Sequence, residues 1–235
     1  MQTIKDKVAL ITGATKGIGY GIAEALLKQG VKVAITSRSQ KSADEAAQKL
    51  GGNVLGIAAD VKDFKSQQEA VAKTIEKFGS LDFLIANAGV GHFAPIDELS
   101  VEDWEETIDT NLTGVFYSVK AALEAIIKAK GYIITISSLA GTNFFAGGSA
   151  YNASKFGLTG FSQSIMLDLR KHDVKVTTIM PGSVATHFAE HTPDKEKDAW
   201  KIQPEDIGQM VADLLNMNPR TLPSKIEVRP TRTSN

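Results

Sequence analysis

The sequence predicts an α/β domain with a doubly wound parallel sheet of about seven strands and helices on both faces. Short β-branched runs alternate with longer amphipathic stretches along the chain, and such alternation is typical of parallel strands joined by right-handed crossovers. The strand runs are apolar throughout, which indicates strands covered on both faces. Because the 235 residues contain no internal repeat or linker, we expect a single domain over residues 1–235.

The individual elements follow from these runs. Strands are expected over residues 8–12, 31–36, 54–58, 84–86, 132–136, 174–179 and 226–228. Helices are expected from the glycine-rich turn after the first strand to about residue 27, and over 41–50, 65–78, 101–128, 150–170 and 204–215. Glycines follow the first three helices, and Pro204 begins the last. Both residue types are common at these helix positions.

Composition excludes several classes of function. The net charge of −1 provides no basic field for nucleic acid or anionic lipid. The absence of cysteine excludes disulfides and thiolate metal sites, and the four histidines show no metal-ligand spacing, so no metal is expected. No run approaches the length of a membrane span, and the first residues lack the apolar stretch of a secretory signal. A cytoplasmic protein without membrane or nucleic-acid partners is expected.

The first strand runs into a glycine-rich loop, Thr12-Gly13-Ala14-Thr15-Lys16-Gly17-Ile18-Gly19. Gly13 can take the sharp turn, Gly17 lets the backbone approach a pyrophosphate, and Gly19 lets helix and strand pack closely. The helix N-terminus then offers free N–H groups and a positive dipole end. The spacing differs from the common G-x-G-x-x-G fingerprint. Its place between the first strand and the first helix nevertheless favours a Rossmann-type dinucleotide site over a plain tight turn.

The end of the second strand indicates which dinucleotide binds. NAD-binding domains usually carry an acidic residue there, which bonds the ribose 2′-hydroxyl, whereas this strand ends in Ser37 and Arg38. The forked guanidinium of Arg38 suits a 2′-phosphate, and Lys16 can reach the same group from the loop. Both could instead be solvated surface cations. Together, and without the acid, they favour NADP(H).

Ser138, Tyr151 and Lys155 form the pattern S-x12-Y-x3-K. Tyr151 and Lys155 share one face of a predicted helix because they are four residues apart, and Ser138 closes the fifth strand. A neighbouring ammonium group lowers the pKa of a tyrosine from about 10. Tyr151 could then give a proton to a carbonyl oxygen that Ser138 orients. Alone, the Tyr–Lys pair reads as a helical surface pair; with the glycine loop it predicts a catalytic site.

With these motifs in order, the sequence resembles the short-chain dehydrogenase/reductase family over about residues 4–215. The resemblance implies adenine contacts by Asp60 and Val61, and support of the central strands and the adenosine ribose by Asn87, Ala88 and Gly89. It also implies that Asn111 kinks a long helix and holds a water linked to Lys155. The segment expected to position the nicotinamide amide contains Pro181, Gly182, Val184 and Thr186.

The resemblance implies transfer of hydride from NADPH to a ketone or aldehyde carbonyl, either a small molecule or an acyl thioester. The residues around Tyr151 are similar to those of 3-oxoacyl-(acyl-carrier-protein) reductases. The segment after Leu215 lacks their glycine-rich ending and looks more like NADP-dependent hydroxy-acid dehydrogenases or sepiapterin-reductase-like members. An NAD-linked alcohol or hydroxy-acid dehydrogenase and a non-catalytic NADP-binding regulator are the alternatives.

The resemblance further implies a homotetramer or homodimer through helices 101–128 and 150–170. Apolar residues such as Val115, Phe116 and Val119 fit that interface, but they fit packing on the sheet equally well. The expected pocket edges are His92-Phe93, Asn143-Phe144-Phe145 and His187-Phe188. Aromatic walls of this kind suit an uncharged or acyl substrate, although the phenylalanines could equally belong to the core.

Overall fold

Seven parallel strands form one sheet in the order β3-β2-β1-β4-β5-β6-β7. The computed structural model describes residues 3–233, so the ends of the expected 1–235 domain lie outside the described residues. The α/β prediction is confirmed. The strands are β1 (Val8–Ile11), β2 (Lys32–Ser37), β3 (Val54–Ala58), β4 (Phe83–Ala86), β5 (Tyr132–Ile136), β6 (Lys175–Pro181) and β7 (Lys225–Val228).

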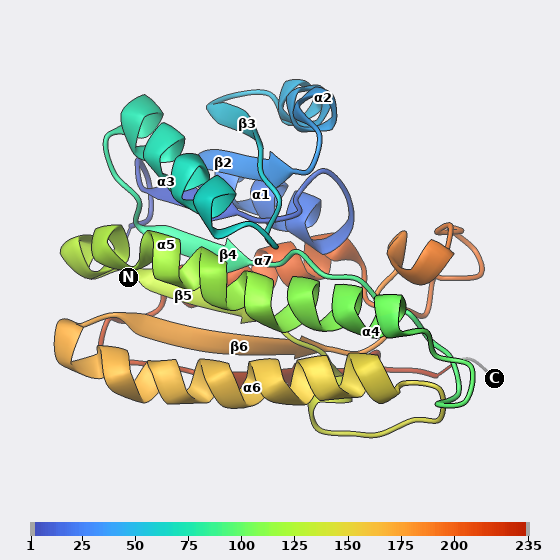
Figure 1. The fold of residues 1–235 in the computed structure, drawn as a ribbon. Coiled ribbons are helices and arrows are strands. Elements are labelled where there is room, and N and C mark those ends of the chain that lie inside the picture. Colours follow the sequence, from blue (N-terminus) through green and yellow to red (C-terminus); the bar gives the residue numbers. More distant parts are fainter. Residues whose placement is uncertain (1–2, 234–235) are drawn as a thin grey trace.

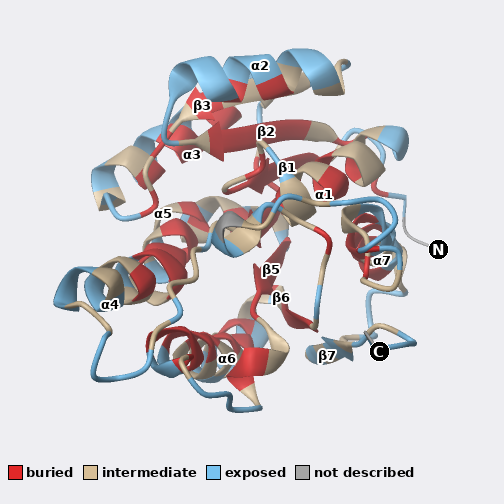
Figure 2. Ribbon diagram, turned by 90° about the vertical axis from the view of Figure 1, so that its right-hand side faces the viewer, coloured by how far each residue is buried: buried red, intermediate tan, exposed pale blue. Residues whose placement is uncertain are grey.

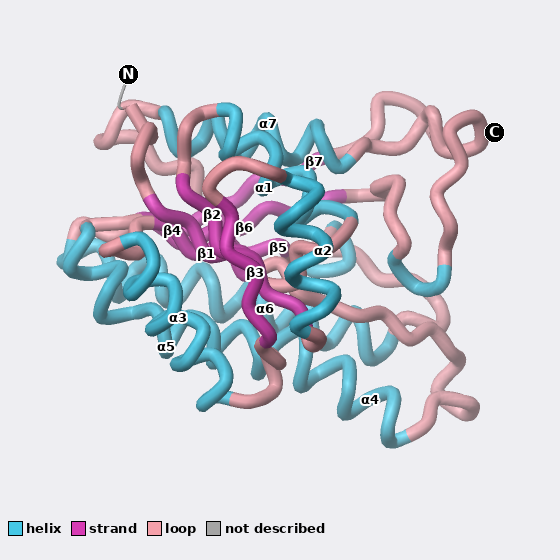
Figure 3. The backbone as a smooth tube through the Cα atoms, turned by 90° about the horizontal axis from the view of Figure 1, so that it is seen from above, coloured by secondary structure: helices cyan, strands magenta, loops and turns pink. Residues whose placement is uncertain are grey.

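Helices cover both faces of this sheet, as Figures 1 and 3 show. The helices are α1 (Gly17–Lys28), α2 (Gln40–Leu50), α3 (Phe64–Phe78), α4 (Val101–Ile108), α5 (Gly114–Ala129), α6 (Ser149–Leu169) and α7 (Pro204–Asn216). Helices α1 and α7 pack on one face, and α3, α5 and α6 pack on the other. Within residues 3–233, no helix is both long enough and apolar enough to cross a lipid bilayer.

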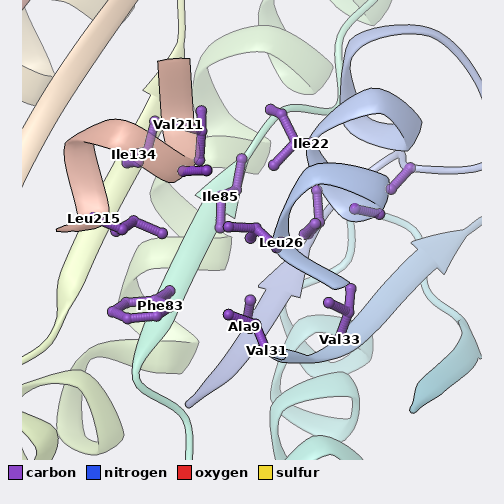
Figure 4. Close-up of a cluster of buried hydrophobic side chains, with 14 of the residues drawn as sticks. Ala9, Ile22, Leu26, Val31, Val33, Phe83, Ile85, Ile134, Val211 and Leu215 are labelled. Atoms are coloured by element: carbon purple, nitrogen blue, oxygen red, sulfur yellow. The ribbon is translucent and has the colours of Figure 1, made fainter. Parts of the chain in front are cut away.

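Each face of the sheet has its own buried apolar cluster. In one of them, Ile22 and Leu26 of α1 and Val211 of α7 meet Ile85 and Ile134 of the central strands (Figure 4). Removal of this apolar surface from water is the main force that holds the layers together. It fixes α1 against the sheet, so the loop before α1 is held at the carboxyl end of β1.

Helices α1 and α7 approach one another at glycines. A Cβ atom at Gly21 would lie 2.5 Å from the carbonyl oxygen of Pro204, and one at Gly208 would collide with the carbonyl oxygen of Gly21. Only residues without a side chain allow this backbone contact. The start of α7, and the segment that leads into it, are therefore held against the first turns of α1.

The last strand departs from the expectation that every strand is covered on both faces. Exposed and half-buried residues alternate along β7, whereas all residues of β1, β4 and β5 are buried. Figure 2 shows β7 largely pale blue and tan beside the red central strands. The prediction is wrong for β7 because it is an edge strand, and an edge strand need not be covered on both faces.

The helix expected over residues 101–128 is interrupted. A π-helical turn over Asp109–Thr113, which contains Asn111, separates α4 from α5, and a kink at Asn111 stays a prediction. Such single π-turns are frequent at functional sites. The interruption brings the buried side chain of Asn111 against the backbone of Val90, which follows β4.

The apolar residues of α5 divide between the core and the surface. Val115 and Val119 are buried in the cluster beneath α3, α5 and α6. The side chain of Phe116 remains 45% exposed on the outer side of α5. Packing on the sheet therefore explains the two valines, and assembly of copies through α5 and α6 stays a prediction that rests on Phe116 and its neighbours.

Candidate active site

A cleft of about 1130 Å³ lies at the carboxyl ends of the strands and brings the expected site residues together. Ligands of open α/β sheets bind at this edge. Among its lining residues are Gly13, Thr15, Lys16, Gly17, Ile18, Ser37, Arg38, Asp60, Val61, Asn87, Ala88, Gly89, Ser138, Tyr151, Lys155, Pro181, Gly182, Val184 and Thr186. Two expected residues, Gly19 and Asn111, are buried and are not among the lining residues.

The glycine loop is held by the segment after β4. Gly13 has a φ of +63°, and a Cβ atom there would lie 2.8 Å from the Cα atom of Ala88. The Asn87 side-chain amide donates to the carbonyl oxygens of Thr12 and Gly13 at 2.9 and 3.0 Å. A Cβ atom at Gly19 would lie 2.6 Å from that same amide nitrogen. Gly19 therefore allows close packing at the start of α1, as the sequence predicts.

The first turn of α1 fits an anionic ligand. Its N-cap residue, Lys16, is extended and provides no side-chain cap, and the first turn contains no acidic residue. The N–H groups of this turn therefore have no side-chain acceptor at the N-cap, and they stand at the positive end of the helix dipole. A dinucleotide pyrophosphate is the kind of group that such a helix start holds.

Arg38 and Lys16 both line the cleft. The Arg38 side chain is 75% exposed, and its Nη1 atom lies 3.9 Å from Oε1 of Glu106, too far for a hydrogen bond. Its guanidinium donors are thus available to a ligand. With Ser37 at the end of β2 and no acid in that position, these residues fit a dinucleotide that carries a 2′-phosphate.

Tyr151 and Lys155 occupy one face of α6, as their spacing predicts. The Lys155 Nζ atom lies 5.6 Å from the centre of the Tyr151 ring and donates to the carbonyl oxygen of Ile136 at 3.0 Å. Ser138 caps a short 3-10 turn, where its Oγ atom accepts from the N–H of Ala140 at 3.1 Å. All three side chains line the cleft.

Burial decides the protonation of this pair. It raises the pKa of Tyr151 to about 12, which the Ser138 hydroxyl opposes, and it lowers the pKa of Lys155 to about 8. The prediction that Lys155 lowers the tyrosine pKa is therefore wrong for the net shift. The rings of Phe93 and Phe188 lie 5.4 and 5.5 Å from that of Tyr151 and help remove it from water. Tyr151 is consequently a protonated phenol at neutral pH.

Asn111 is fully buried and uses its whole carboxamide inside the protein. Its Oδ1 atom accepts from the N–H of Val90, and its Nδ2 atom donates to the Val90 carbonyl and to Ser154. A Cβ atom at Gly89 would lie 3.2 Å from Asn111 Oδ1 and 3.7 Å from Lys155 Nζ. The asparagine therefore stands close to Lys155, and its side chain braces the strand end beside it.

A lid formed by residues 183–203 covers one side of the cleft, and Figure 1 shows it in orange at the right of the sheet. Asp198, only 5% exposed, accepts from Lys201 and His191, both at 2.6 Å, and from the N–H of Asp194. These contacts hold the pKa of the Asp198 carboxyl well below its usual range. Sequence reasoning missed this cluster, although the i, i+3 spacing of Asp198 and Lys201 was a weak signal for it.

The expected pocket edges are confirmed in part. Phe93, Asn143, Phe145, His187 and Phe188 line the cleft. His92 instead lies 3.0 Å from a carboxylate oxygen of Glu106. Phe144 is 82% exposed and stacks on Phe156 with ring centres 5.0 Å apart. In residues 3–233 no group of three or more metal-ligating side chains is gathered.

The last part of the described chain also reaches the cleft. Arg229, Pro230, Arg232 and Thr233 line it, although the sequence predicted no site or pocket residue beyond Phe188. Gly182 donates its N–H to the carbonyl oxygen of Val228 at 2.8 Å, so the segment after β7 starts beside Gly182. No sequence motif predicts that this segment lies beside the cleft, because its position depends on the pairing of β7 with β6.

Comparison with known proteins supports the same family. The model of the short chain dehydrogenase family matches residues 7–197. This chain belongs to the short-chain dehydrogenase family. An uncharacterized oxidoreductase of Staphylococcus saprophyticus is 35% identical over 98% of this chain and 100% of its own. A 3-oxoacyl-(acyl-carrier-protein) reductase of Vibrio cholerae is 34% identical over 91% of each chain.

Solved structures of the family have the same architecture. An alcohol dehydrogenase from the archaeon Thermococcus sibiricus, complexed with 5-hydroxy-NADP, superposes with a TM-score of 0.89 at 31% identity over 97% of this chain and 98% of its own. A 3-ketoacyl-(acyl-carrier-protein) reductase from Brucella melitensis, complexed with NADH, has the same TM-score at 25% identity, over 97% and 99%. These neighbours bind nicotinamide cofactors, and this chain is an oxidoreductase of the same family.

Proposed function

We propose that this oxidoreductase uses NADPH to reduce a ketone or aldehyde to an alcohol, with Tyr151 as the proton donor. The observation that carries the proposal is the convergence of Ser138, Tyr151 and Lys155 with the glycine loop in one cleft. Each of these features is weak alone. Their meeting at one edge of the sheet is what a hydride-transfer site requires, because the cofactor and the carbonyl must lie side by side.

The protein groups have distinct roles in this proposal. The bound cofactor supplies the hydride that adds to the carbonyl carbon. Tyr151, which its burial keeps protonated, gives its phenolic proton to the carbonyl oxygen, and the product is a neutral alcohol. The Ser138 hydroxyl donates a hydrogen bond to the same oxygen and so orients it. The ammonium of Lys155 lies beside Tyr151 and stabilises the phenolate left after proton transfer.

The preference for NADPH rests on Arg38 and Lys16. Both cations line the cleft, and the end of β2 provides no carboxylate to bond a ribose 2′-hydroxyl. Asp60, Val61 and Asn87–Gly89 would hold the adenosine, and Pro181, Gly182, Val184 and Thr186 would hold the nicotinamide end. The named relatives act on acyl-carrier-protein thioesters in one case and on an alcohol in another, which leaves a small ketone and an acyl thioester as the candidate substrates.

The deciding experiment follows the loss of 340 nm absorbance with NADPH and NADH in parallel. The panel contains an acetoacetyl thioester, a 3-oxo ester, an aromatic diketone and a simple aldehyde, and the control is Tyr151→Phe. Turnover with NADPH that Tyr151→Phe abolishes would support the proposal. Faster turnover with NAD and an alcohol would indicate an oxidative dehydrogenase. Cofactor binding without turnover of any carbonyl would sink the reductase proposal in favour of a regulator.

A further inference from the structure

The charges that line the cleft are unevenly distributed. Among the residues that the structure describes, two carboxylates line it, Asp60 and Glu106. Asp60 follows β3, and Glu106 approaches Arg38, which follows β2. Both acids therefore lie in the half of the cleft expected to hold the adenosine. Among the described lining residues, the other half contains no carboxylate, although Lys201, Arg229 and Arg232 all reach it.

Sheet order separates these three cations from the expected 2′-phosphate site. Arg38 follows β2 and Arg229 follows β7, which are five strands apart in the order β2-β1-β4-β5-β6-β7. Neighbouring strands lie about 4.8 Å apart, so the two ends are separated by roughly 24 Å. By the same rule the end of β7 is only about 10 Å from the end of β5, which Ser138 follows. The cations Lys201, Arg229 and Arg232 therefore lie in the half of the cleft expected to hold the substrate.

Most of the cations in this half already have partners. Lys201 and His191 are paired with the buried Asp198, and Arg229 lies 3.1 Å from a carboxylate oxygen of Glu227 on the same strand. Arg232 has no carboxylate within 4.0 Å among the residues that the structure describes. Within the described part of the chain, its guanidinium can therefore accept a ligand without breaking an ion pair.

The position of Arg232 relative to the reaction site follows from its neighbours. A Cβ atom at Gly182 would lie 3.3 Å from Cδ of Pro230 and 3.1 Å from Cδ1 of Leu139. Pro230 thus packs in the same place as the residue that follows Ser138, and Arg232 comes two residues later. The same cleft has aromatic lining residues, Phe93, Phe145, Phe188 and Trp200, and the rings of Phe93 and Phe188 lie next to that of Tyr151.

We infer that the substrate of this enzyme is an oxo acid, a ketone or aldehyde that also carries a carboxylate, and that Arg232, assisted by Arg229, binds the carboxylate. This inference rests on the proposed carbonyl reduction and adds the class of its substrate. A guanidinium binds a carboxylate through two parallel hydrogen bonds. The aromatic walls pack on the carbon skeleton between the carboxylate and the carbonyl that faces Tyr151.

Two matched pairs of ketones test the inference by turnover, namely 4-acetylbenzoate and 4-oxopentanoate, each against its methyl ester, with saturating NADPH. A charge-assisted pair predicts a kcat/KM at least about tenfold higher for the acids. Arg232→Gln should remove most of that preference while leaving the esters within about twofold. The preference should also shrink as salt is added. The matched control is Arg220→Gln, an exposed arginine outside the cleft.

A binding measurement keeps the inference testable if no ketone is reduced. Titration calorimetry of the NADPH-loaded protein compares 4-ethylbenzoate with 4-ethylbenzamide, neither of which can be reduced. Tighter binding of the acid by about tenfold, lost in Arg232→Gln or Arg229→Gln, supports the carboxylate site even where turnover fails and the proposed function falls. Equal binding of acid and amide, or a preference that both arginine variants retain, would overturn it. Faster turnover of the esters or of a neutral thioester would overturn it as well.

Discussion

The carboxamide of Asn111 forms a pair of 2.8 Å hydrogen bonds with the N–H and the carbonyl of Val90. These bonds hold the backbone that follows β4 against the π-helical turn between α4 and α5. The asparagine side chain is fully buried, whereas Val90 is half-buried and lines the cleft. The brace sets the position of the segment from Asn87 to Val90, which lines the cleft.

Asn111→Ala is therefore expected to destabilise the protein by about 1–3 kcal/mol, because two partly buried backbone groups lose their hydrogen bonds. Urea denaturation followed by circular dichroism measures the change. Asn53→Ala provides the control, since Asn53 is exposed in a turn before β3, and it should change the free energy of unfolding by less than about 0.5 kcal/mol. Equal effects of the two substitutions would show that the brace contributes nothing.

Burial of the Lys155 ammonium should lower the free energy of unfolding relative to a variant with an apolar side chain at this position. Burial lowers its pKa from 10.5 to about 8, and each unit corresponds to about 1.4 kcal/mol. Lys155→Met removes that cost, so it should abolish reduction and yet stabilise the fold at pH 7 by about 1–3 kcal/mol. The pKa shift alone corresponds to about 3.5 kcal/mol, and loss of the hydrogen bond to Ile136 reduces this gain.

The sign of the pH dependence follows from the same shift. Between about pH 8 and 10.5 the unfolded lysine still holds its proton while the folded one has lost it, so the stability of the wild type rises with pH. The difference in the free energy of unfolding between Lys155→Met and the wild type should fall by about half between pH 7 and pH 9.5. Parallel urea titrations at the two pH values measure this. A stability difference that stays constant with pH would show that Lys155 is neutral or solvated throughout.

Cofactor choice is predicted to depend on Arg38. Arg38→Ser should weaken NADPH binding by about 10- to 100-fold and change NADH binding by less than about threefold, because only NADPH has a phosphate for the guanidinium. Quenching or enhancement of nicotinamide fluorescence gives both dissociation constants. Arg220→Ser is the matched control on the surface. An equal loss for both cofactors would mean that Arg38 holds the adenine or the loop and does not read the phosphate.

Much of the fold and the catalytic group could be predicted because they depend on local patterns. The apolar runs identify β1, β4 and β5, and the spacing of Tyr151 and Lys155 places them on one helical face without knowledge of anything distant. The failures involve long-range packing. Burial raises the pKa of Tyr151, and the rings of Phe93, from the loop after β4, and Phe188, from the lid, contribute to that burial. No local pattern states that they meet.

The same reason explains the residues that were missed. Asp198 lies in an irregular segment, and its importance comes from being folded between His191 and Lys201. Arg229 and Arg232 reach the cleft because β7 is the edge strand beside β6. Such placements depend on the order of the strands. The alternation of elements predicts a parallel sheet, but it does not state which strand ends adjoin the catalytic serine.

The cluster around Asp198 is expected to keep the lid closed over Tyr151. Asp198→Asn removes the charge that holds Lys201 and His191, so the segment that carries Phe188 should open more often, while the sheet and its two apolar clusters stay intact. Limited trypsin digestion should then cut after Lys195 or Lys197 several-fold faster than in the wild type, with an unchanged midpoint in urea.

In the wild type the pKa of Asp198 lies below its usual value, so the carboxylate stabilises the lid above about pH 4 and loses this effect only in stronger acid. Lys77→Gln, which removes a surface lysine at the end of α3, is the control for general protease sensitivity. Cleavage in the lid at the wild-type rate would show that contacts other than this ion cluster hold the segment in place.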